Sequence, residues 1–293
     1  MSFETTSSTN QVGSRLRRRR LGAEKPGFAG PGHTAVEVIT SEAFSESDPF
    51  VLLMDDRLDF PPGRQVGGPH PHAGLETVTF VLDGSIDDRD EGLVHAGDVV
   101  WMTAGRGVIH NEEVRAAGKV RVLQLWVTLP ERARAAAPRF QVLRKADMPV
   151  FRAPGVLARL YSGQSNGLVS ATRNHVPVTL VDVTLEPGGV FEQELPASFN
   201  GFLLPISGEV AVDGERAPLG PGEIGWVGSR DGNEPLRVRL LANRGEARVL
   251  LYAGARQDEP TIHYGPFVAG SVAGIEAMYR DFRAGRFTKV SEL

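Results

Sequence analysis

The sequence predicts an all-β protein built from two antiparallel β-barrels, with short helices that include one near the C-terminus. The 34 glycines and 20 prolines among 293 residues favour short strands joined by turns over long helices. Runs of β-branched and aromatic residues recur at short spacing and end in turn signals. The second half repeats this succession of strands and turns, so we expect a second barrel of the same kind.

Composition places the chain among ordinary globular proteins. Hydrophobic residues make up 41% and charged residues 23%, and the chain is long enough for two domains that each have a core. A net charge of -4 gives no general attraction to nucleic acid, so we expect no direct nucleic acid binding. The lack of cysteine excludes disulfides, thiolate ligands and cysteine nucleophiles, and it fits a reducing cytosol.

Residues 1–32 are rich in Ser, Thr, Gly and Arg and carry Arg15 and Arg17–Arg20. A basic cluster can dock on nucleic acid or acidic lipid, but at a chain terminus it is more often a solvated tail. We therefore predict a flexible basic tail. Neither a secretory signal nor a run of roughly 20 apolar residues is present, which predicts a cytoplasmic protein without a membrane contact.

Residues 33–137 are predicted to form the first barrel. Strands are expected at 36–39 and at 50–54, the second of which ends at an acidic turn, Asp55-Asp56. Residues 77–84 read TVTFVLDG, a strand closed by an Asp-Gly hairpin turn, and residues 94–102 pass through a further Gly-Asp turn. Residues 119–128 resemble a buried strand, residues 131–137 a short helical connection, and residues 138–149 an interdomain linker.

Two short runs in this barrel carry the candidate metal ligands. Side chains of a strand repeat every two residues, so His70 and His72 leave one face, as do His110 and Glu112. Either pair alone is more often incidental, because histidines are common in loops and at strand ends. The strands between the pairs raise the odds, because a small barrel would return the second pair to the first and form a pocket of imidazole and carboxylate ligands.

Residues 150–293 are predicted to form the second barrel and the C-terminal helix. Strands are expected at 179–185, 190–195, 201–206 and 249–254. Where a second histidine pair would lie, the chain has Glu192 and Glu194, for which we expect a structural or solvent-facing role. The helix is indicated by a cap at Ser271, a stop at Gly285 and an apolar stripe. The stripe consists of Ile275, Met278, Tyr279 and Phe282.

The other four histidines have no ligand-type residue two positions away, so we expect surface or hydrogen-bonded roles for them. They are His33, His95, His175 and His263.

Several of these motifs resemble a known family. Residues 68–76, the Gly-Asp turn at 97–98 and His110 look like the two-part cupin motif. Residues 69–79, 101–112, 123–130 and 264–268 together resemble the pirin family, over a span from about 50 to 286. Residues 32–38 depart from the usual pirin opening. The resemblance implies a bicupin, with a metal in the first barrel only.

The resemblance also implies the ligand set. It places the carboxylate ligand at Glu112 beside His70, His72 and His110. In cupins generally the glutamate after the histidine pair is often a ligand, so Glu76 is expected as an orienting residue or an alternate ligand. Iron(II) fits this set best, although Mn²⁺, Ni²⁺, Cu²⁺ and Zn²⁺ are alternatives because affinity alone does not select among them.

Two functions follow from the resemblance. The first is a quercetinase-type dioxygenase that opens the ring of a flavonol, in which Glu112 or Glu76 accepts a proton from the substrate. The alternative is an iron-dependent, redox-sensing regulator that binds a transcription factor or a metabolic enzyme, and a purely structural cupin ranks last. A pocket of several hundred cubic ångströms above the metal would favour the enzyme.

Overall fold

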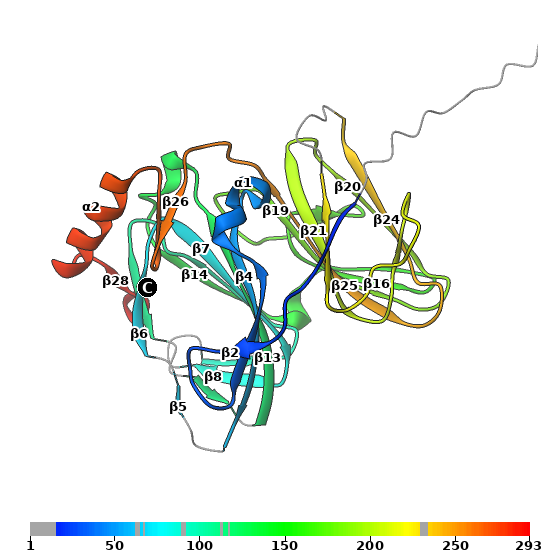
Figure 1. The fold of residues 1–293 in the computed structure, drawn as a ribbon, viewed down its shortest axis with the longest axis horizontal. Helices are drawn as coiled ribbons and strands as arrows, with labels where there is room; N and C mark the ends of the chain where they lie inside the picture. The colour runs from blue at the N-terminus through cyan, green and yellow to red at the C-terminus, as the bar shows by residue number, and fades with distance from the viewer. Residues whose placement is uncertain are drawn as a thin grey trace, which may run out of the picture.

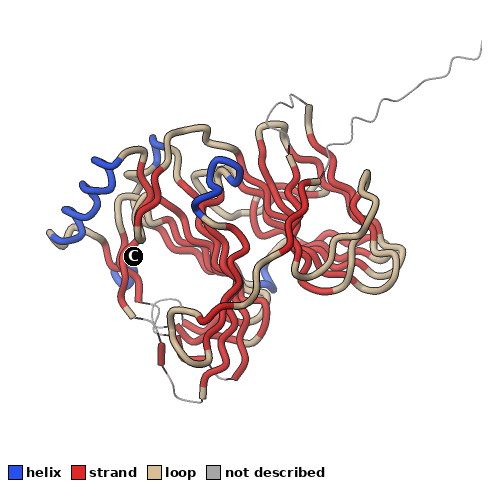
Figure 2. Tube along the Cα trace, in the orientation of Figure 1, coloured by secondary structure: helices blue, strands red, loops and turns tan. Residues whose placement is uncertain are grey.

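The protein consists of two β-barrels that lie side by side (Figure 1), and strands dominate both (Figure 2). The computed structural model describes residues 16–61, 65–66, 68–88, 92–111, 114–116, 118–228 and 234–293. The prediction of an all-β fold with two barrels is confirmed. No helix in these ranges is long and apolar enough to cross a membrane.

The first barrel closes a large sheet against two small ones. The large sheet contains, in spatial order, β14 (Arg139–Leu143), β10 (Val99–Thr103), β7 (Leu75–Asp83), β13 (Gly118–Thr128), β4 (Phe50–Phe60), β3 (His33–Ile39) and β2 (Lys25–Pro26). One small sheet contains β28 (Thr288–Lys289), β11 (Val108–Asn111) and β6 (Pro69–His72). The other contains β5 (Gln65–Val66), β12 (Val114–Ala116), β8 (Ser85–Asp88) and β9 (Gly92–His95).

The second barrel repeats this plan around its own apolar core. Its large sheet contains β1 (Arg17–Arg20), β23 (Glu223–Val227), β21 (Phe199–Ser207), β25 (Ala247–Ala255), β19 (Val178–Leu185), β16 (Val156–Ser162) and β15 (Val150–Ala153). The facing sheet contains β20 (Val190–Leu195), β24 (Leu236–Leu241) and β22 (Ala211–Val212). The remaining short pairs are β17 (Gln164–Ser165) with β18 (Leu168–Val169), and β26 (Ile262–Tyr264) with β27 (Phe267–Ala269).

The outer faces of the two large sheets pack on each other. Phe80 of β7 contacts Tyr161 of β16, and Phe50 of β4 contacts Phe202 of β21, with ring centroids 5.0 and 5.2 Å apart. All four side chains belong to one buried cluster that draws on both barrels. Burial of this much aromatic surface holds the barrels together, because the free energy gained scales with the apolar area removed from water.

Both chain ends cross to the barrel formed by the other half of the sequence. Near the N-terminus, β1 pairs with β23 of the second barrel. Near the C-terminus, β28 pairs with β11 of the first barrel, and helix α2 (Val272–Arg283) lies beside that barrel (Figure 1). The expected flexible tail therefore differs from the structure for residues 16–32, which contain β1 and β2, whereas residues 1–15 lie outside the described ranges.

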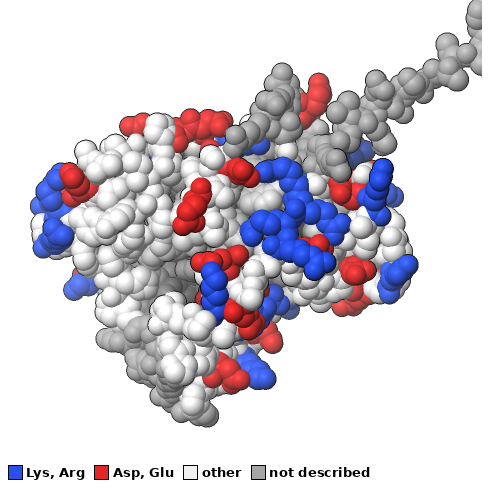
Figure 3. Space-filling model, viewed as in Figure 1, with Lys and Arg blue, Asp and Glu red and all other residues white. Residues whose placement is uncertain are grey.

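The arginines of β1 are held by acidic partners of both barrels. Arg17 forms an ion pair with Glu46 and Arg18 one with Glu223, each at 2.8 Å. Lys and Arg side chains gather where β1 runs across the face drawn in Figure 3. Strand pairing and these ion pairs explain why a run of four arginines is ordered here.

Several element boundaries differ from the sequence predictions. The expected turn at Asp55-Asp56 is part of the long strand β4, because Arg121 binds Asp55 and His33 binds Asp56 inside the sheet. The connection at 131–137 contains only the 3-10 turn η2 (Glu131–Ala133). The expected linker contains β14, which extends the first barrel, and the 3-10 turn η3 (Lys145–Asp147).

The short helical elements follow local sequence signals. Helix α2 begins after Ser271, whose Oγ accepts a hydrogen bond from the Gly274 N–H at 3.2 Å, and Gly285 follows with φ 68°. These features confirm the predicted C-terminal helix. The other short helices are α1 (Phe44–Ser47), η1 (Ser41–Ala43) and η4 (Val290–Glu292).

Candidate metal centre

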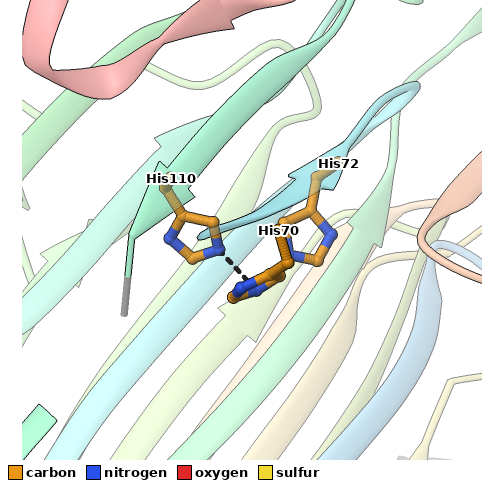
Figure 4. Close-up of side chains that lie close together, drawn as sticks. All are labelled: His70, His72 and His110. Atoms are coloured by element: carbon orange, nitrogen blue, oxygen red, sulfur yellow. Dashed lines mark hydrogen bonds between the residues drawn. The ribbon is translucent and has the colours of Figure 1, made fainter. Parts of the chain in front are cut away.

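Three of the four predicted ligands converge on one point of the first barrel. Strands β6 and β11 pair antiparallel with His70 opposite His110, and His72 lies two residues further along β6. One ring nitrogen from each histidine lies within 4.8 Å of the others. Figure 4 shows the three imidazoles approaching one another from the two strands. The two-residue spacing of His70 and His72 thus has the structural effect expected of it.

Two glycines allow the ligand strands to pass closely under the C-terminal segment. Gly74, at φ 78°, leaves no room for a side chain, because a Cβ atom would lie 1.8 Å from the Val268 carbonyl oxygen of β27. Gly107 precedes β11 at φ 134°, and a Cβ atom there would lie 2.3 Å from the Phe287 ring. Positive φ and close backbone approach both require glycine. The C-terminal segment therefore helps to fix the histidine strands.

The hydrogen bonding of His70 suits a metal ligand. Its Nδ1 lies 2.9 Å from the Gly68 carbonyl oxygen, so Nδ1 carries the proton and donates it. The lone pair is then on Nε2, which lies 2.8 Å from Nε2 of His110. A carbonyl on the far nitrogen is the usual way in which a protein orients a metal-binding imidazole.

His72 is the most deeply enclosed of the three. Its side chain is buried, and its ring centroid lies 5.0 Å from that of Trp126. Neither ring nitrogen makes a hydrogen bond with standard geometry to any described residue. Burial and then the neighbouring His70 lower the pKa of His72 to about 3, and the Pro266 carbonyl opposes this only in part. His72 is therefore a neutral imidazole with an available lone pair.

His110 has the same electrostatic environment. Burial, His72 and His70 together lower the pKa of His110 well below the ordinary value for histidine. The three rings meet edge-on or at a tilt, with centroids 4.2 to 5.0 Å apart, and a cation bound between them would be coordinated by their nitrogen lone pairs. The residues present therefore fit a first-row transition metal.

The two carboxylates considered as ligands, Glu112 and Glu76, are not among the described residues that the structure brings together with the histidines. Glu112 lies outside the described residues, one position beyond the end of β11 at Asn111. Glu76 is described, and it does not join the three histidines. It lies opposite Val127 of β13, one position from Trp126, whose ring contacts His72, so alternation along the strand turns Glu76 to the other face of the sheet.

The carboxylate of Glu76 is fully buried between the two barrels. It accepts hydrogen bonds from Trp101 Nε1 at 3.1 Å, Thr103 Oγ1 at 2.7 Å and the His175 N–H at 3.4 Å, and Arg139 lies 4.0 Å away. Burial raises the pKa of Glu76, although these donors and Arg139 act in the opposite direction. The Glu76 side chain therefore belongs to the interface between the two barrels and points away from the three histidines.

A cavity of about 1010 Å³ opens beside the histidines. Its wall includes His70, His72 and Trp126 from the histidine end, and Leu52 and Met54 from β4. Apolar walls with a few polar groups are typical of sites for small organic molecules. The arrangement places two of the three histidines in the wall of a space large enough for a substrate, with His110 next to them.

Two cavity residues were not predicted as functional. His33 was expected to be isolated, but its Nε2 lies 2.7 Å from Oδ1 of Asp56, and both residues line the cavity. A search for ligands two positions apart misses this pair because Asp56 comes 23 residues later, on the neighbouring strand. The structural or solvent-facing role expected for Glu192 and Glu194 agrees with the structure, since Glu192 forms an ion pair with Arg239 at 3.2 Å and Glu194 is exposed.

Comparisons with known proteins agree with the fold and the site. The pirin family model matches residues 32–127, and the model of the pirin C-terminal cupin domain matches residues 180–288. A pirin-like protein of tomato, Solanum lycopersicum, is 34% identical over 252 residues, which cover 82% of this chain and 81% of that protein.

Solved structures extend the comparison. A quercetin 2,3-dioxygenase of Acinetobacter baumannii has a TM-score of 0.81 and 27% identity, covering 94% of this chain and 98% of its own. The bacterial pirin YhhW of Escherichia coli, solved in complex with nickel(II), has a TM-score of 0.62 and covers 83% of this chain and 99% of its own. At 18% identity this second likeness supports the fold alone. Two barrels, a histidine group in the first of them and matches to both family models show that this chain belongs to the pirin family.

Proposed function

We propose that the first barrel binds a divalent transition metal through His70, His72, His110 and Glu112. The convergence of the three histidines and the lone pairs of His70 and His72 support the nitrogen ligands. Glu112 is the fourth ligand in this proposal because it follows His110 at strand spacing. Iron(II) is the metal we favour, and Mn²⁺, Ni²⁺, Cu²⁺ and Zn²⁺ suit the same ligand set.

We further propose that the protein is a dioxygenase of the quercetinase type, with a flavonol as substrate. The apolar wall formed by Trp126, Leu52 and Met54 would receive the flat aromatic rings and exclude water from them. Glu112 would accept the proton of the flavonol 3-hydroxyl. When bound, the metal would polarise the oxygens of the substrate. Glu76 is not part of this proposal, since its carboxylate faces the interface between the barrels.

The observation that carries the proposal is the cavity of about 1010 Å³ beside the three histidines. A redox-sensing regulator requires access only for water or an electron donor, whereas an enzyme requires room for its substrate. The cavity volume therefore favours the enzyme over the regulator that binds a transcription factor or a metabolic enzyme. The related quercetin 2,3-dioxygenase of Acinetobacter baumannii lends further support.

The test is to load the protein anaerobically with iron(II), add oxygen and quercetin, and follow the flavonol absorbance. We expect a loss of absorbance that requires both the protein and the metal. Loading with the other four metals in parallel would rank them by rate. Controls are the metal-free protein and iron(II) in buffer. Quercetin that persists at the rate of the controls with every metal would refute the enzymatic proposal and favour the regulator.

A further inference from the structure

A second polar group lies on the cavity wall, away from the three histidines. His33 of β3 is almost fully buried, and its Nδ1 accepts a hydrogen bond from the Ala29 N–H at 3.2 Å. Because Nδ1 accepts, the proton is on Nε2, which donates to Oδ1 of Asp56 at 2.7 Å. The Phe28 ring packs edge-on against the imidazole, with centroids 5.0 Å apart. His33 thus holds Asp56 in one orientation.

The other oxygen of this carboxylate is available to a ligand. Within the described ranges, Oδ2 of Asp56 makes no hydrogen bond or ion pair, and Asp56 lines the cavity. A carboxylate oxygen accepts hydrogen bonds and donates none when ionised. The site that it offers therefore suits an O–H or N–H group of a bound molecule.

Gln124 of β13 adds a donor between this group and the histidines. Its Oε1 accepts a hydrogen bond from the Thr79 hydroxyl, which fixes the carboxamide. No described residue accepts from its Nε2, and Gln124 lines the cavity. The two amide hydrogens can therefore be donated to an oxygen of a ligand.

Strand register orders these groups along the cavity. Trp126, whose ring contacts His72, lies opposite Leu52, Gln124 lies opposite Met54, and Asp56 lies opposite Val122. Trp126 and Val122 are four residues apart, which corresponds to about 13 Å along a strand. From the histidine end, the wall thus offers an aromatic ring, then a donor, then an anionic acceptor, with Leu52 beside the ring and Met54 beside the donor.

We propose that Asp56, held by His33, is a specificity-determining residue that accepts a hydrogen bond from a phenolic hydroxyl at the end of the substrate remote from the metal, while Gln124 donates to an oxygen between the two ends. This inference rests on the proposed function, which places the reacting end of the substrate at the histidines. It narrows the substrate class to elongated, flat aromatic molecules that carry a hydroxyl at the remote end.

The test measures binding without turnover. Metal-loaded protein is titrated anaerobically with quercetin and with 3-hydroxyflavone, which keeps the chelating oxygens but lacks the remote hydroxyls, and Kd is determined by quenching of tryptophan fluorescence. We expect the wild-type protein to bind quercetin at least about tenfold more tightly, since a hydrogen bond to a charged group contributes about this factor. Asp56→Asn should remove most of this difference and leave Kd for 3-hydroxyflavone unchanged.

The matched control is Glu37→Gln, the same change at a cavity-lining carboxylate that is ion-paired with Lys25 at 2.7 Å. It should retain the wild-type preference for quercetin. Equal Kd values for the two flavonols in the wild-type protein would overturn the inference. An Asp56→Asn variant that still prefers quercetin as strongly as the wild type would also overturn it, and so would a wild-type protein that binds neither flavonol. Tight, Asp56-dependent binding without oxygen consumption would uphold the inference and refute the dioxygenase proposal.

Discussion

At the residue scale, His72 has the least ordinary environment in the candidate centre. A buried polar group without a hydrogen bond costs about 1–3 kcal/mol, and among the described residues only the Pro266 carbonyl acts on the two ring nitrogens of His72, without standard hydrogen-bond geometry. A core position with this cost is usually apolar, so an imidazole here indicates a role that an apolar side chain cannot take. Metal coordination would recover the cost, which is why the fit of the three histidines to a cation is more than a matter of proximity.

The first prediction concerns His110. Replacing His110 by alanine removes one imidazole of the group, so we expect metal affinity to fall by more than the about 10–100-fold that loss of a supporting partner causes. Both barrels should stay folded, as judged by circular dichroism. Metal content is measured by mass spectrometry after loading. His263→Ala is the control, since His263 lies 5.6 Å from Trp126 by ring centroids but outside the group. Equal metal content in wild type and His110→Ala would contradict the ligand assignment.

The second prediction separates Glu76 from the metal. Glu76→Gln keeps the size of the side chain but replaces one acceptor oxygen by a donor that faces Trp101 or Thr103. We expect the free energy of unfolding in urea to fall by about 1–3 kcal/mol, because a buried group loses its partner. Metal content should stay at the wild-type level. A selective loss of metal with unchanged stability would instead mean that Glu76 acts on the ligands.

Residue spacing predicts the histidines at one end of the cavity but not the polar pair at the other end. His70 and His72 could be predicted because two residues on one strand share a face whatever the rest of the fold does. His33 could not, because its partner Asp56 is on another strand and the contact depends on the register of β3 with β4. The face of Glu76 was equally hidden, since it depends on which side of β7 the second barrel covers.

At the scale of elements, the turn between β6 and β7 links the histidines to the C-terminal segment. Gly74→Ala would place a methyl group 1.8 Å from the Val268 carbonyl oxygen, so β27 or β6 must move. We expect destabilisation well beyond the about 1–2 kcal/mol of left-handed strain, and weaker metal binding. Gly92→Ala is the matched control, because Gly92 has φ 70° and no atom of a residue in the described ranges, apart from its chain neighbours, lies within 4 Å of the added methyl group. The measurements are thermal unfolding and metal titration of both variants. Equal effects of the two substitutions would show that the contact between Gly74 and Val268 is not important.

The turn between β9 and β10 predicts a response to pH. Burial opposes ionisation of Asp98, but hydrogen bonds from the N–H groups of Lys145 and His95 and from Arg144 outweigh it and lower the pKa of Asp98. A lowered pKa in the folded state stabilises the protein above the ordinary pKa of roughly 4, and this contribution is lost as pH falls through the folded value.

Asp98→Asn should therefore reduce the free energy of unfolding by about 1–3 kcal/mol at neutral pH and by much less at a pH below the lowered pKa of the folded protein, where the wild-type carboxylate is also protonated. Urea unfolding of both proteins at the two pH values measures this. A difference that stays constant between them would show that Asp98 contributes through packing rather than charge.

Helices and strands could be predicted from the local sequence pattern where one face of the element is buried. Alternation predicted the site of β20, and capping residues predicted α2, because both depend on neighbours in sequence. The strand β1 was missed because four successive arginines have no apolar face, and its order comes from pairing with β23 some 200 residues later. Asp55 was interpreted as part of a turn because its partner, Arg121, comes 66 residues later in the sequence.

At the scale of the whole molecule, the crossed chain ends connect the two barrels. Asn200 of the second barrel donates to the Asp48 carbonyl of the first at 3.0 Å, and the Tyr161 hydroxyl donates to the Gly97 carbonyl. Together with β1, β28 and the aromatic cluster between the sheets, these contacts make each barrel dependent on the other half of the chain. The second barrel, which has no histidine group among its described residues, thus supports a site that it does not itself contain.

The last prediction tests this dependence at Phe287, which precedes β28. Its ring is buried against Phe267 and the half-buried Phe282, packs over Gly107 and so supports the strand that carries His110. Phe287→Ala should cost about 3–5 kcal/mol by opening a cavity, and it should weaken metal binding although no ligand is changed. Phe151→Ala is a control of the same type that packs on the core of the second barrel. Because Phe151 packs on the apolar cluster of the second barrel, its loss should lower the midpoint of urea unfolding and leave the metal affinity of the folded protein unchanged. If the two variants instead bind metal equally well, the C-terminal segment stabilises the barrel without shaping its centre.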